Sequence, residues 1–359
     1  MGKPAHILFR RRDGSIRLIL PTANRRVLRS VLNMYFPSRL LGKVYRLAQQ
    51  IVMPVQTRLG WCESAGDVAA WGKGLEQALA LVPSARPEYV GALISEPGPR
   101  SKLTLKIMDE AGQALAYGRV GYTPMAMEVI RHETTVLKVL ANMPVASQVP
   151  QLLGAADLVG HMGCYMMESA GPDLEAGHEL TYAHFQFLSG LKTGMTKKWT
   201  AVVEQLDNDV APLFKIQGLS ATVDNAMQFL KSLDLPDVPV VIEHGDFAPW
   251  NIRCSQDGGL FILDWEHSRR DGLPWMDALH FVFRYLWLVR RQSHESIRNE
   301  LVMTIRSGQR SYPTWDATLV KSDSAFIIIF FLRLLVSNRY EREEIISMIL
   351  ITPTLFTPK

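Results

Sequence analysis

Hydrophobic positions between residues 88 and 170 recur with the short spacing that is typical of strands. The segments EYVGALIS, SKLTLKIMD and ALAYGRVGY are separated by the Gly- and Pro-containing connections EPGPR and EAGQ, which favours antiparallel strands joined by short turns. In the next segment, AMEVIRHETTVLKVLANM, one helical face carries Val129, Val136, Leu137 and Leu140. Two more apolar runs, in VPQLLGAADLVGHMGCYMMES, complete the pattern. It predicts a five-stranded sheet with one helix.

From residue 171 onwards, the pattern changes to one that favours helices. Residues 181–233 are predicted to be mostly helical, with interruptions at Gly194 and Pro212. VPVVIE predicts a strand that runs into the polar loop HGD, and IRCS with LFILD predicts a small hairpin around QDGG. The final ninety residues are again predicted to be helical. Their most apolar run, residues 325–336, is too short to span a bilayer and contains Arg333, so it predicts a buried helix.

The head of the chain combines a helical pattern with a strong positive charge. Between residues 25 and 52, helical spacing is shown by Leu28, Val31, Leu32 and Tyr35, and Pro37 separates two predicted helices. One interpretation is a helical extension that packs on the body of the protein. The other is a basic amphipathic element that lies on anionic lipid. We favour the first, because a basic helical pattern alone rarely establishes membrane contact.

Composition limits the class of protein without naming its function. The 359 residues, 47% of them hydrophobic, suffice for two domains or one two-lobed unit. The net charge is +4, but residues 1–60 hold twelve Lys or Arg and one acid, so the head carries +11 and the rest −7. This asymmetry suggests that residues 1–60 meet an anionic membrane surface. We do not expect nucleic acid as a partner, because the body is acidic and the head lacks the pattern of a known binding module.

The cysteines and the start of the chain bear on its compartment. The three cysteines, Cys62, Cys164 and Cys254, are far apart and have no metal-like spacing, so neither a disulfide framework nor a zinc site is indicated. No apolar signal core follows the basic start, and no transmembrane segment is predicted. We therefore expect a cytoplasmic protein, with peripheral membrane contact as the alternative.

The segment VIEHGDFAPWNIRCSQDGGLFILDWEHS, residues 241–268, places many polar groups beside apolar runs. Burying such groups unpaired is costly, so a function must retain them. Asp246 and Asn251 lie in one loop, and the hairpin returns the chain so that Asp264 can reach the same cavity. Asn251 and Asp264 offer the hard oxygen ligands that Mg²⁺ prefers. Asp246 stays free to accept a hydrogen bond from an attacking hydroxyl, an arrangement that suits phosphoryl transfer.

The motif HGDFAPWN followed by ILDWE resembles the signatures of the aminoglycoside phosphotransferase and choline kinase family, which are protein-kinase-like phosphotransferases. The resemblance covers roughly residues 88–340. It implies that Asp246 is the catalytic base, that Asn251 and Asp264 bind Mg²⁺, and that ATP is the phosphate donor. The alternative interpretation is an ordinary turn rich in Asp and Asn, which are common loop formers.

The resemblance also implies an α+β, protein-kinase-like two-lobed fold, with a small antiparallel-sheet N-lobe and a larger, mostly helical C-lobe. On this basis residues 1–87 form a basic helical N-terminal extension, residues 88–170 a strand-rich nucleotide-binding lobe, and residues 171–359 a helical catalytic and acceptor-binding lobe.

The resemblance carries over to residues upstream of the motif. Arg119 occupies the family's phosphate-binding lysine position, with Glu133 as its partner. Arg cannot act as the compact charge that Lys provides, although it can pair with a carboxylate and reach phosphate oxygens. If Arg119 is an ordinary surface residue instead, Lys106 on the neighbouring strand is the substitute.

Other roles rest on the same resemblance. Glu168 and Ala170 would contact adenine through their main chains and Met167 would line the base pocket, although Met in apolar stretches is also common core filler. The loop EPGPRSK lacks GxGxxG, so its backbone N–H groups near Ser101 could bind phosphate or belong to a plain turn. His244 is expected to hold the loop, and Asp277 to brace it.

We therefore predict an ATP-dependent phosphotransferase that moves the γ-phosphate to a hydroxyl of a small molecule such as a sugar, amino sugar or amino alcohol. The acceptor's charge stays open, because Arg269 and Arg270 lie beside Glu266 in the sequence. The alternative is a catalytically silent kinase-like scaffold that docks on a membrane or an anionic polymer through its basic N-terminal region.

Overall fold

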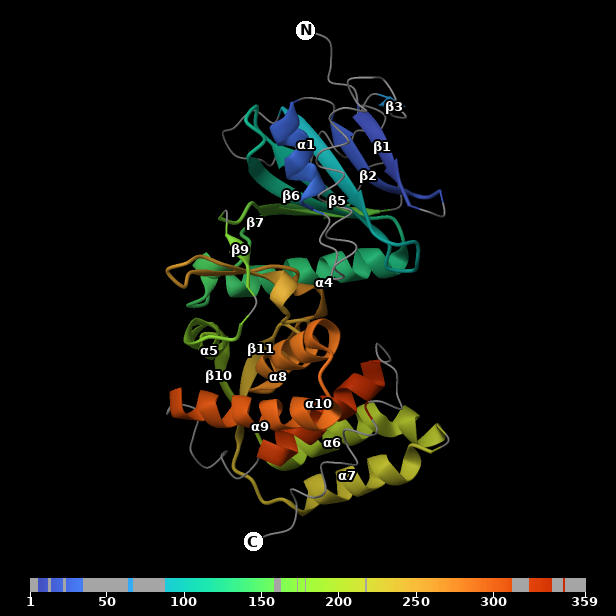
Figure 1. Cartoon of the computed structure of the whole chain (residues 1–359). Coiled ribbons are helices and arrows are strands. Elements are labelled where there is room, and N and C mark those ends of the chain that lie inside the picture. Colours follow the sequence, from blue (N-terminus) through green and yellow to red (C-terminus); the bar gives the residue numbers. More distant parts are fainter. Residues whose placement is uncertain are drawn as a thin grey trace. The chain divides into compact units, whose positions relative to one another are not determined.

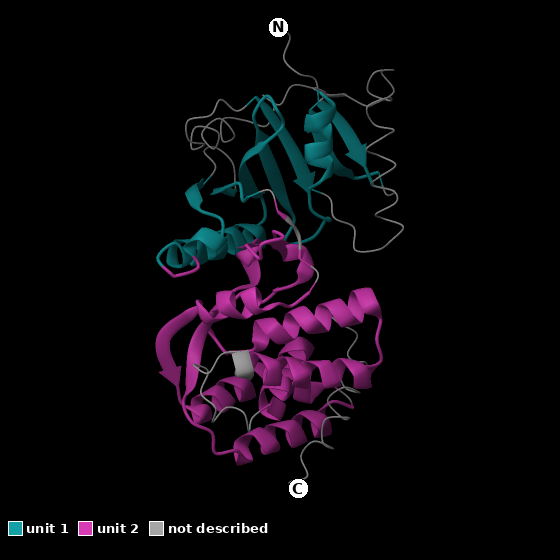
Figure 2. Ribbon diagram, turned by 60° about the vertical axis from the view of Figure 1, so that its left-hand side comes forward, with its two compact units in different colours: residues 1–142, 146–173 teal, residues 143–145, 174–359 magenta. Residues whose placement is uncertain are grey.

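The structure of the protein is a computed structural model, in which the chain divides into two compact units. Unit 1 comprises residues 1–142 and 146–173, and unit 2 comprises residues 143–145 and 174–359 (Figure 2). The structure describes residues 6–11, 14–21, 24–34, 64–66, 88–157, 163–172, 174–177, 179–216, 218–311, 323–337 and 345.

The five strands and the helix predicted between residues 88 and 170 are all present in unit 1 (Figure 1). They are β4 (Tyr89–Ile94), β5 (Lys102–Met108), β6 (Ala114–Gly121), α4 (Pro124–Leu140), β7 (Leu152–Asp157) and β8 (Cys164–Ser169). Within the sheet these strands follow the order β4-β5-β6-β8-β7, and each neighbouring pair is antiparallel. Helix α4 packs against β6, β7 and β8.

The N-terminal region differs from the expected helical extension. In the described part of residues 1–87 only α1 (Arg25–Leu32) is helical, whereas β1 (His6–Arg10), β2 (Ile16–Pro21) and β3 (Ser64–Gly66) are strands. Strand β2 pairs with β4, with Leu18 opposite Leu93, so the head extends the same sheet. HILFR and IRLILP are short apolar runs around a turn in which Gly14 has φ 83°, which is a strand signal. The second predicted helix, after Pro37, lies outside the described residues.

Helix α1 buries its apolar face within unit 1. Its first turn is capped by Asn24, whose side chain accepts hydrogen bonds from the backbone N–H groups of Arg26 and Val27 at 2.9 and 3.0 Å. The four buried side chains of the helix, Val27, Leu28, Val31 and Leu32, belong to one core cluster with residues of β1, β2 and β5. Of the two interpretations of this basic helix, packing on the body is therefore the one observed. Its apolar face is not presented to a lipid surface.

Unit 2 combines helices with two small sheets. The predicted strand is β11 (Val238–Glu243), and the predicted hairpin is β12 (Ile252–Cys254) with β13 (Leu260–Ile262), turning at Gly258 with φ 87°. Strand β9 (Glu175–Ala176) pairs with β12, and β14 (Arg269–Gly272) pairs with β11. The predicted C-terminal helices are α8 (Met276–Arg284), the π-helical turn η6 (Tyr285–Arg290), α9 (His294–Ser311) and α10 (Asp323–Ser337).

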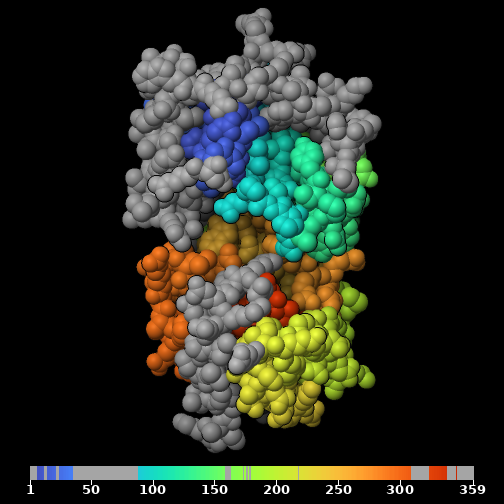
Figure 3. All heavy atoms as spheres, turned by 90° about the vertical axis from the view of Figure 1, so that its right-hand side faces the viewer, coloured from blue at the N-terminus to red at the C-terminus, as the bar shows by residue number. Residues whose placement is uncertain are grey.

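The segment 181–233 is less helical than predicted. It contains α5 (Tyr182–Ser189), α6 (Trp199–Val210), the 3-10 turn η3 (Ala211–Lys215) and α7 (Ser220–Ser232), but β10 (Lys192–Lys197) is a strand. Lys192 pairs with Val241 of β11, and such tertiary pairing overrides the weak local preference of KTGMTK. Helices α6 and α7 pack together and form part of one face of unit 2, yellow-green and yellow in Figure 3.

Helix α10 is the buried helix that the apolar run predicts. Ten of its side chains, from Ala325 to Leu335, are buried. Among the described residues, no helix combines the length and the apolar character needed to cross a membrane.

The contact between α1 and the sheet predicts a position-specific effect on stability. A side chain at Gly91 would collide with Val31 of α1, whereas a Cβ at Gly98, in the β4–β5 connection, would meet nothing within 4 Å. Overpacking of this kind costs about 1–3 kcal/mol. We expect Gly91→Ala to lower the free energy of unfolding of unit 1 by about that amount in urea titrations. Gly98→Ala is the matched control, expected within about 0.5 kcal/mol of the parent, and equal losses in the two variants would contradict the packing described.

Candidate active site

The loop that follows β11 is held by one carboxylate. Asp277, in the first turn of α8, accepts hydrogen bonds from the backbone N–H of His244 at 2.7 Å and from that of Gly245 at 3.0 Å. Gly245 has φ 75°, and a Cβ at this position would collide with the carbonyl of His267, so only glycine fits here. The expected bracing role of Asp277 is thus visible in its contacts.

His244 connects the loop to the strand that precedes Asp264. The ring is fully buried; Nδ1 accepts from the backbone N–H of Asp246 at 3.2 Å, and Nε2 donates to the carbonyl of Leu263 at 2.8 Å. Burial lowers the pKa of this imidazole, so it is neutral at physiological pH. Both nitrogens are used in holding the loop, which agrees with the expected scaffold role.

Asp246 lies at the centre of a polar network. Its Oδ2 accepts from Nδ2 of Asn251 at 3.0 Å, its Oδ1 lies 3.1 Å from Nε2 of His280, and Nη2 of Arg284 is 3.8 Å away. Burial raises the pKa of this carboxyl, but the His280 hydrogen bond and the Arg284 charge outweigh burial and hold the pKa below its usual value. Asp246 is therefore ionised at neutral pH, as a hydrogen-bond acceptor for a hydroxyl must be.

Asn251 is oriented by the same loop. Its amide Nδ2 also donates to the backbone carbonyl of Asp246 at 2.9 Å, and its backbone carbonyl accepts from the N–H of Leu263 at 2.8 Å. Because the amide nitrogen is directed at Asp246, the amide oxygen must point away from it. That orientation suits an oxygen ligand for a cation.

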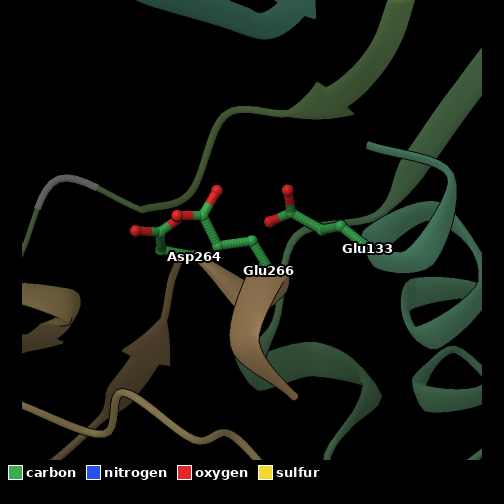
Figure 4. Close-up of side chains that lie close together, drawn as sticks. All are labelled: Glu133, Asp264 and Glu266. Carbon is green, nitrogen blue, oxygen red and sulfur yellow. The ribbon is translucent and has the colours of Figure 1, made fainter. Parts of the chain in front are cut away.

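Asp264 and Glu266 come from one turn after β13, as Figure 4 shows. Asp264 adopts a left-handed backbone conformation, φ 69° and ψ 64°, which costs roughly 1–2 kcal/mol for a residue with a Cβ. Trp265 between them is fully buried and donates from Nε1 to the carbonyl of Ile262 at 3.2 Å, so it holds the turn in place. Carboxylate oxygens of Asp264 and Glu266 lie within 4.8 Å of each other.

These oxygen donors fit Mg²⁺. Two carboxylates and an amide oxygen are hard ligands, and Mg²⁺ completes its shell with water and phosphate oxygens. The sequence analysis assigned no metal-binding role to Glu266. The DWE spacing, with one buried residue between two acids in a turn, is the signal that could have identified Glu266 as a second carboxylate.

In unit 1, Arg119 is buried between two carboxylates. Its Nη2 lies 3.4 Å from Oε1 of Glu133 and 3.4 Å from Oε1 of Glu168. The expected pair with Glu133, a residue of α4 that Figure 4 also labels, is present. Arg119 is 7% exposed, so the alternative of an ordinary surface residue does not hold. The side chain of Glu168 joins this group because Tyr117 pairs with Glu168, which places Glu168 and Arg119 on the same sheet face.

The substitute candidate, Lys106, is engaged elsewhere in unit 1. Its Nζ donates to the carbonyl of Ser30 in α1 at 3.0 Å and lies 5.7 Å from the centre of the Tyr117 ring. Lys106 therefore ties α1 to the sheet.

The predicted adenine contacts are placed as follows. Met167 is fully buried on the face opposite Arg119, in a cluster that includes Leu105 and Val120. The backbone N–H of Ala170 donates to the carbonyl of Leu115 at 3.3 Å. Met167 thus belongs to the interior of unit 1, the N–H of Ala170 is used within that unit, and contact of either group with a nucleotide stays a prediction.

The β4–β5 connection uses its own backbone donors. Ser101 N–H donates to the carbonyl of Gly98 at 3.0 Å, and Lys102 N–H donates to Oγ of Ser95 at 2.8 Å. Of the two interpretations left open, these bonds favour a plain turn.

Comparison with known proteins identifies the fold. No protein-family model matches the chain, and no curated protein matches it by sequence. Among solved structures, a thermostable mutant of aminoglycoside phosphotransferase APH(4)-Ia is similar both in its apo form and in a ternary complex with ADP and hygromycin B. Each comparison has a TM-score of 0.50 and 13% sequence identity, and covers 75% of this chain and 95% of that chain. A macrolide 2'-phosphotransferase type I has a TM-score of 0.49 and 13% identity, over 79% of this chain and 97% of that chain. The comparison with APH(4)-Ia shows that the chain has the fold of that phosphotransferase, an antiparallel-sheet unit followed by a helix-rich unit, which confirms the predicted protein-kinase-like fold class.

Proposed function

We propose that this protein is an ATP-dependent phosphotransferase that moves the γ-phosphate of ATP to a hydroxyl group of a small molecule such as a sugar, amino sugar or amino alcohol. The observation that carries the proposal is the Asp246 network. Its carboxylate is kept ionised by His280 and Arg284, and it orients Asn251 so that the amide oxygen points away. The complex of the similar aminoglycoside phosphotransferase with ADP and hygromycin B supports the same class of donor and acceptor.

In the proposed reaction Asp246 accepts the hydrogen bond of the acceptor hydroxyl and takes its proton. The hydroxyl oxygen forms a bond to the γ-phosphorus while the bond to the oxygen bridging to the β-phosphate breaks, which leaves ADP. Mg²⁺ supplies neutralisation of phosphate charge when it is bound. Asn251 and Asp264 would hold it, and Glu266, whose carboxylate lies near that of Asp264, would add a further ligand.

Unit 1 provides the remaining nucleotide contacts in this proposal. Arg119 neutralises phosphate charge, with Glu133 fixing its guanidinium. The main chains of Glu168 and Ala170 bind adenine, and Met167 lines the base pocket. The pairing of Arg119 with a second carboxylate, Glu168, means that this guanidinium is held more firmly than a single ion pair would hold it.

The first test replaces the proposed base. Asp246→Asn keeps the size of the side chain but removes its ability to take a proton, so we expect turnover to fall by about 10²–10⁴-fold. ADP release would be measured on a panel of sugars, aminoglycosides and amino alcohols, and ATP binding by titration. ATP affinity should stay within about threefold of the parent, because Asp246 is not assigned a nucleotide contact. The control is Asp257→Asn, an exposed residue of the β12–β13 turn. Undiminished turnover in Asp246→Asn would exclude this base.

A second test separates the enzyme from a silent scaffold. If Asp264 holds a cation together with ATP, then ATP should raise the melting temperature more with Mg²⁺ than without it, because only binding to the folded state stabilises it. We expect Asp264→Asn to lose most of the Mg²⁺-dependent part of this shift, with Asp257→Asn again as the control. A shift that is the same with and without Mg²⁺ in the parent protein would favour the scaffold.

A further inference from the structure

A cavity in unit 2 adjoins the proposed base. It lies among the end of β11, the loop, β14, α8 and α10, and its volume of about 240 Å³ is somewhat below the usual range for small-molecule pockets. Two of its lining residues lead directly to Asp246: Gly245 precedes it in the chain, and Nε2 of His280 lies 3.1 Å from its Oδ1. Asp246 itself does not line the cavity, so a molecule there would contact Gly245 and His280, the two neighbours of the proposed base.

The two acidic residues of the cavity wall are already engaged. Glu243 is 4% exposed, and its Oε1 accepts from Nη1 of Arg333 and from the backbone N–H of Leu273, each at 2.6 Å. Asp277 is 5% exposed and accepts the two backbone N–H groups of the loop. Burial also raises the pKa of Asp277 to about 7, so near neutral pH it carries only part of a negative charge. Neither carboxyl is placed to receive the ammonium groups of a polyamine.

The arginines of the wall are ion-paired as well, but a guanidinium keeps N–H donors that a single ion pair does not use. The side chain of Arg269 is 36% exposed, and its Nη2 forms an ion pair with Oδ2 of Asp209 at 3.6 Å. Asp209 does not line the cavity. Arg333 contacts Glu243 through Nη1, but its buried Nε has no hydrogen-bond partner within the part of the chain that the structure describes. His267 also lines the cavity, and its Nε2 lies 3.4 Å from Oε1 of Glu266. Guanidinium groups bind carboxylate and phosphate with paired hydrogen bonds, so this wall presents donors suited to an oxyanion.

We propose that the acceptor alcohol carries an acidic group, a carboxylate or a phosphate, which Arg269 and Arg333 bind while the hydroxyl lies against Asp246. The inference rests on the proposed phosphotransferase function and specifies its substrate class. It sets this chain apart from a kinase for a polycationic acceptor, whose ammonium groups need exposed carboxylates. In this proposal the arginines bind the acidic group that the acceptor already carries, and they do not bind the γ-phosphoryl group that is transferred from ATP.

The test uses four compounds with one six-carbon framework and different charges. Glucosamine is cationic, glucose is neutral, gluconate carries a carboxylate, and glucose 6-phosphate carries a phosphate. Binding to the full chain would be measured by calorimetry at constant ionic strength, and phosphorylation by ADP release with Mg²⁺ and ATP. We expect gluconate or glucose 6-phosphate to bind at least about tenfold more tightly than glucose and glucosamine, as charge-assisted hydrogen bonds predict. The one that binds more tightly identifies which acid the site takes.

Variants of adjacent arginines make the test specific. Arg269→Gln should abolish the preference for the acidic compounds, Arg269→Lys should retain part of it, and Arg270→Gln should leave it unchanged, because Arg270 is exposed and does not line the cavity. Equal melting temperatures of the variants would show that folding is preserved. The tightest binding by glucosamine, no discrimination by charge, or equal effects of Arg269→Gln and Arg270→Gln would overturn the inference.

The readouts also separate this inference from the proposed function. Phosphorylation of a neutral or cationic acceptor, lost in Asp246→Asn, would support the function and overturn the acidic acceptor. A different result would overturn the proposed function. If the acidic compounds bind selectively but none gives ADP release, and ATP does not bind in a Mg²⁺-dependent way, then the protein is not a phosphotransferase and the bound acid is not its acceptor.

Discussion

The candidate site depends on one buried carboxylate that accepts two backbone hydrogen bonds. Asp277 holds the N–H groups of His244 and Gly245, and this fixes a loop that has little secondary structure of its own. Further hydrogen bonds connect this loop to the neighbouring hairpin: the ring of His244 bonds to the carbonyl of Leu263, and the N–H of Leu263 donates to the carbonyl of Asn251. A loop is normally the most mobile part of a protein. Here a chain of directed hydrogen bonds gives it the rigidity that a catalytic arrangement needs.

The arrangement around Asp246 shows how one network can set both orientation and charge. Asn251 and His280 bind different oxygens of the same carboxylate, so the group has one favoured rotation. Arg284 lies 4.7 Å over the ring of Trp250 while it approaches Asp246. The aromatic contact limits where this cation can move. The carboxylate therefore stays ionised although it is mostly buried.

Much of the fold could be predicted from the sequence, and the failures have a physical pattern. The strands from Tyr89 to Gly121 and helix α4 were predicted because their apolar spacing is clear over many residues. Strand β10 was missed because KTGMTK becomes a strand only by pairing with β11. The strands of residues 6–10 and 16–21 were not predicted, because their apolar runs are short and have several arginines in and beside them. Pairing across the chain cannot be seen in local periodicity.

The site residues also divide into those that a local motif predicts and those that only tertiary contacts bring together. The motif around Asp246, Asn251 and Asp264 is contiguous enough to be recognised from the sequence alone. By contrast, the contacts of Glu168 with Arg119 and of His280 with Asp246 join residues that are 49 and 34 positions apart. These contacts depend on strand register and helix packing, which no local motif encodes.

The pairing of β2 with β4 changes how the first residues of the chain should be regarded. They are not an appendage to a complete sheet, since β2 covers the edge of β4, and α1 covers the apolar side chains beside it. A protein that began at residue 88 would expose an unpaired strand edge next to an uncovered apolar surface, the combination from which strands of different molecules associate. The solubility of unit 1 thus depends on its first residues as much as on the strands that follow them.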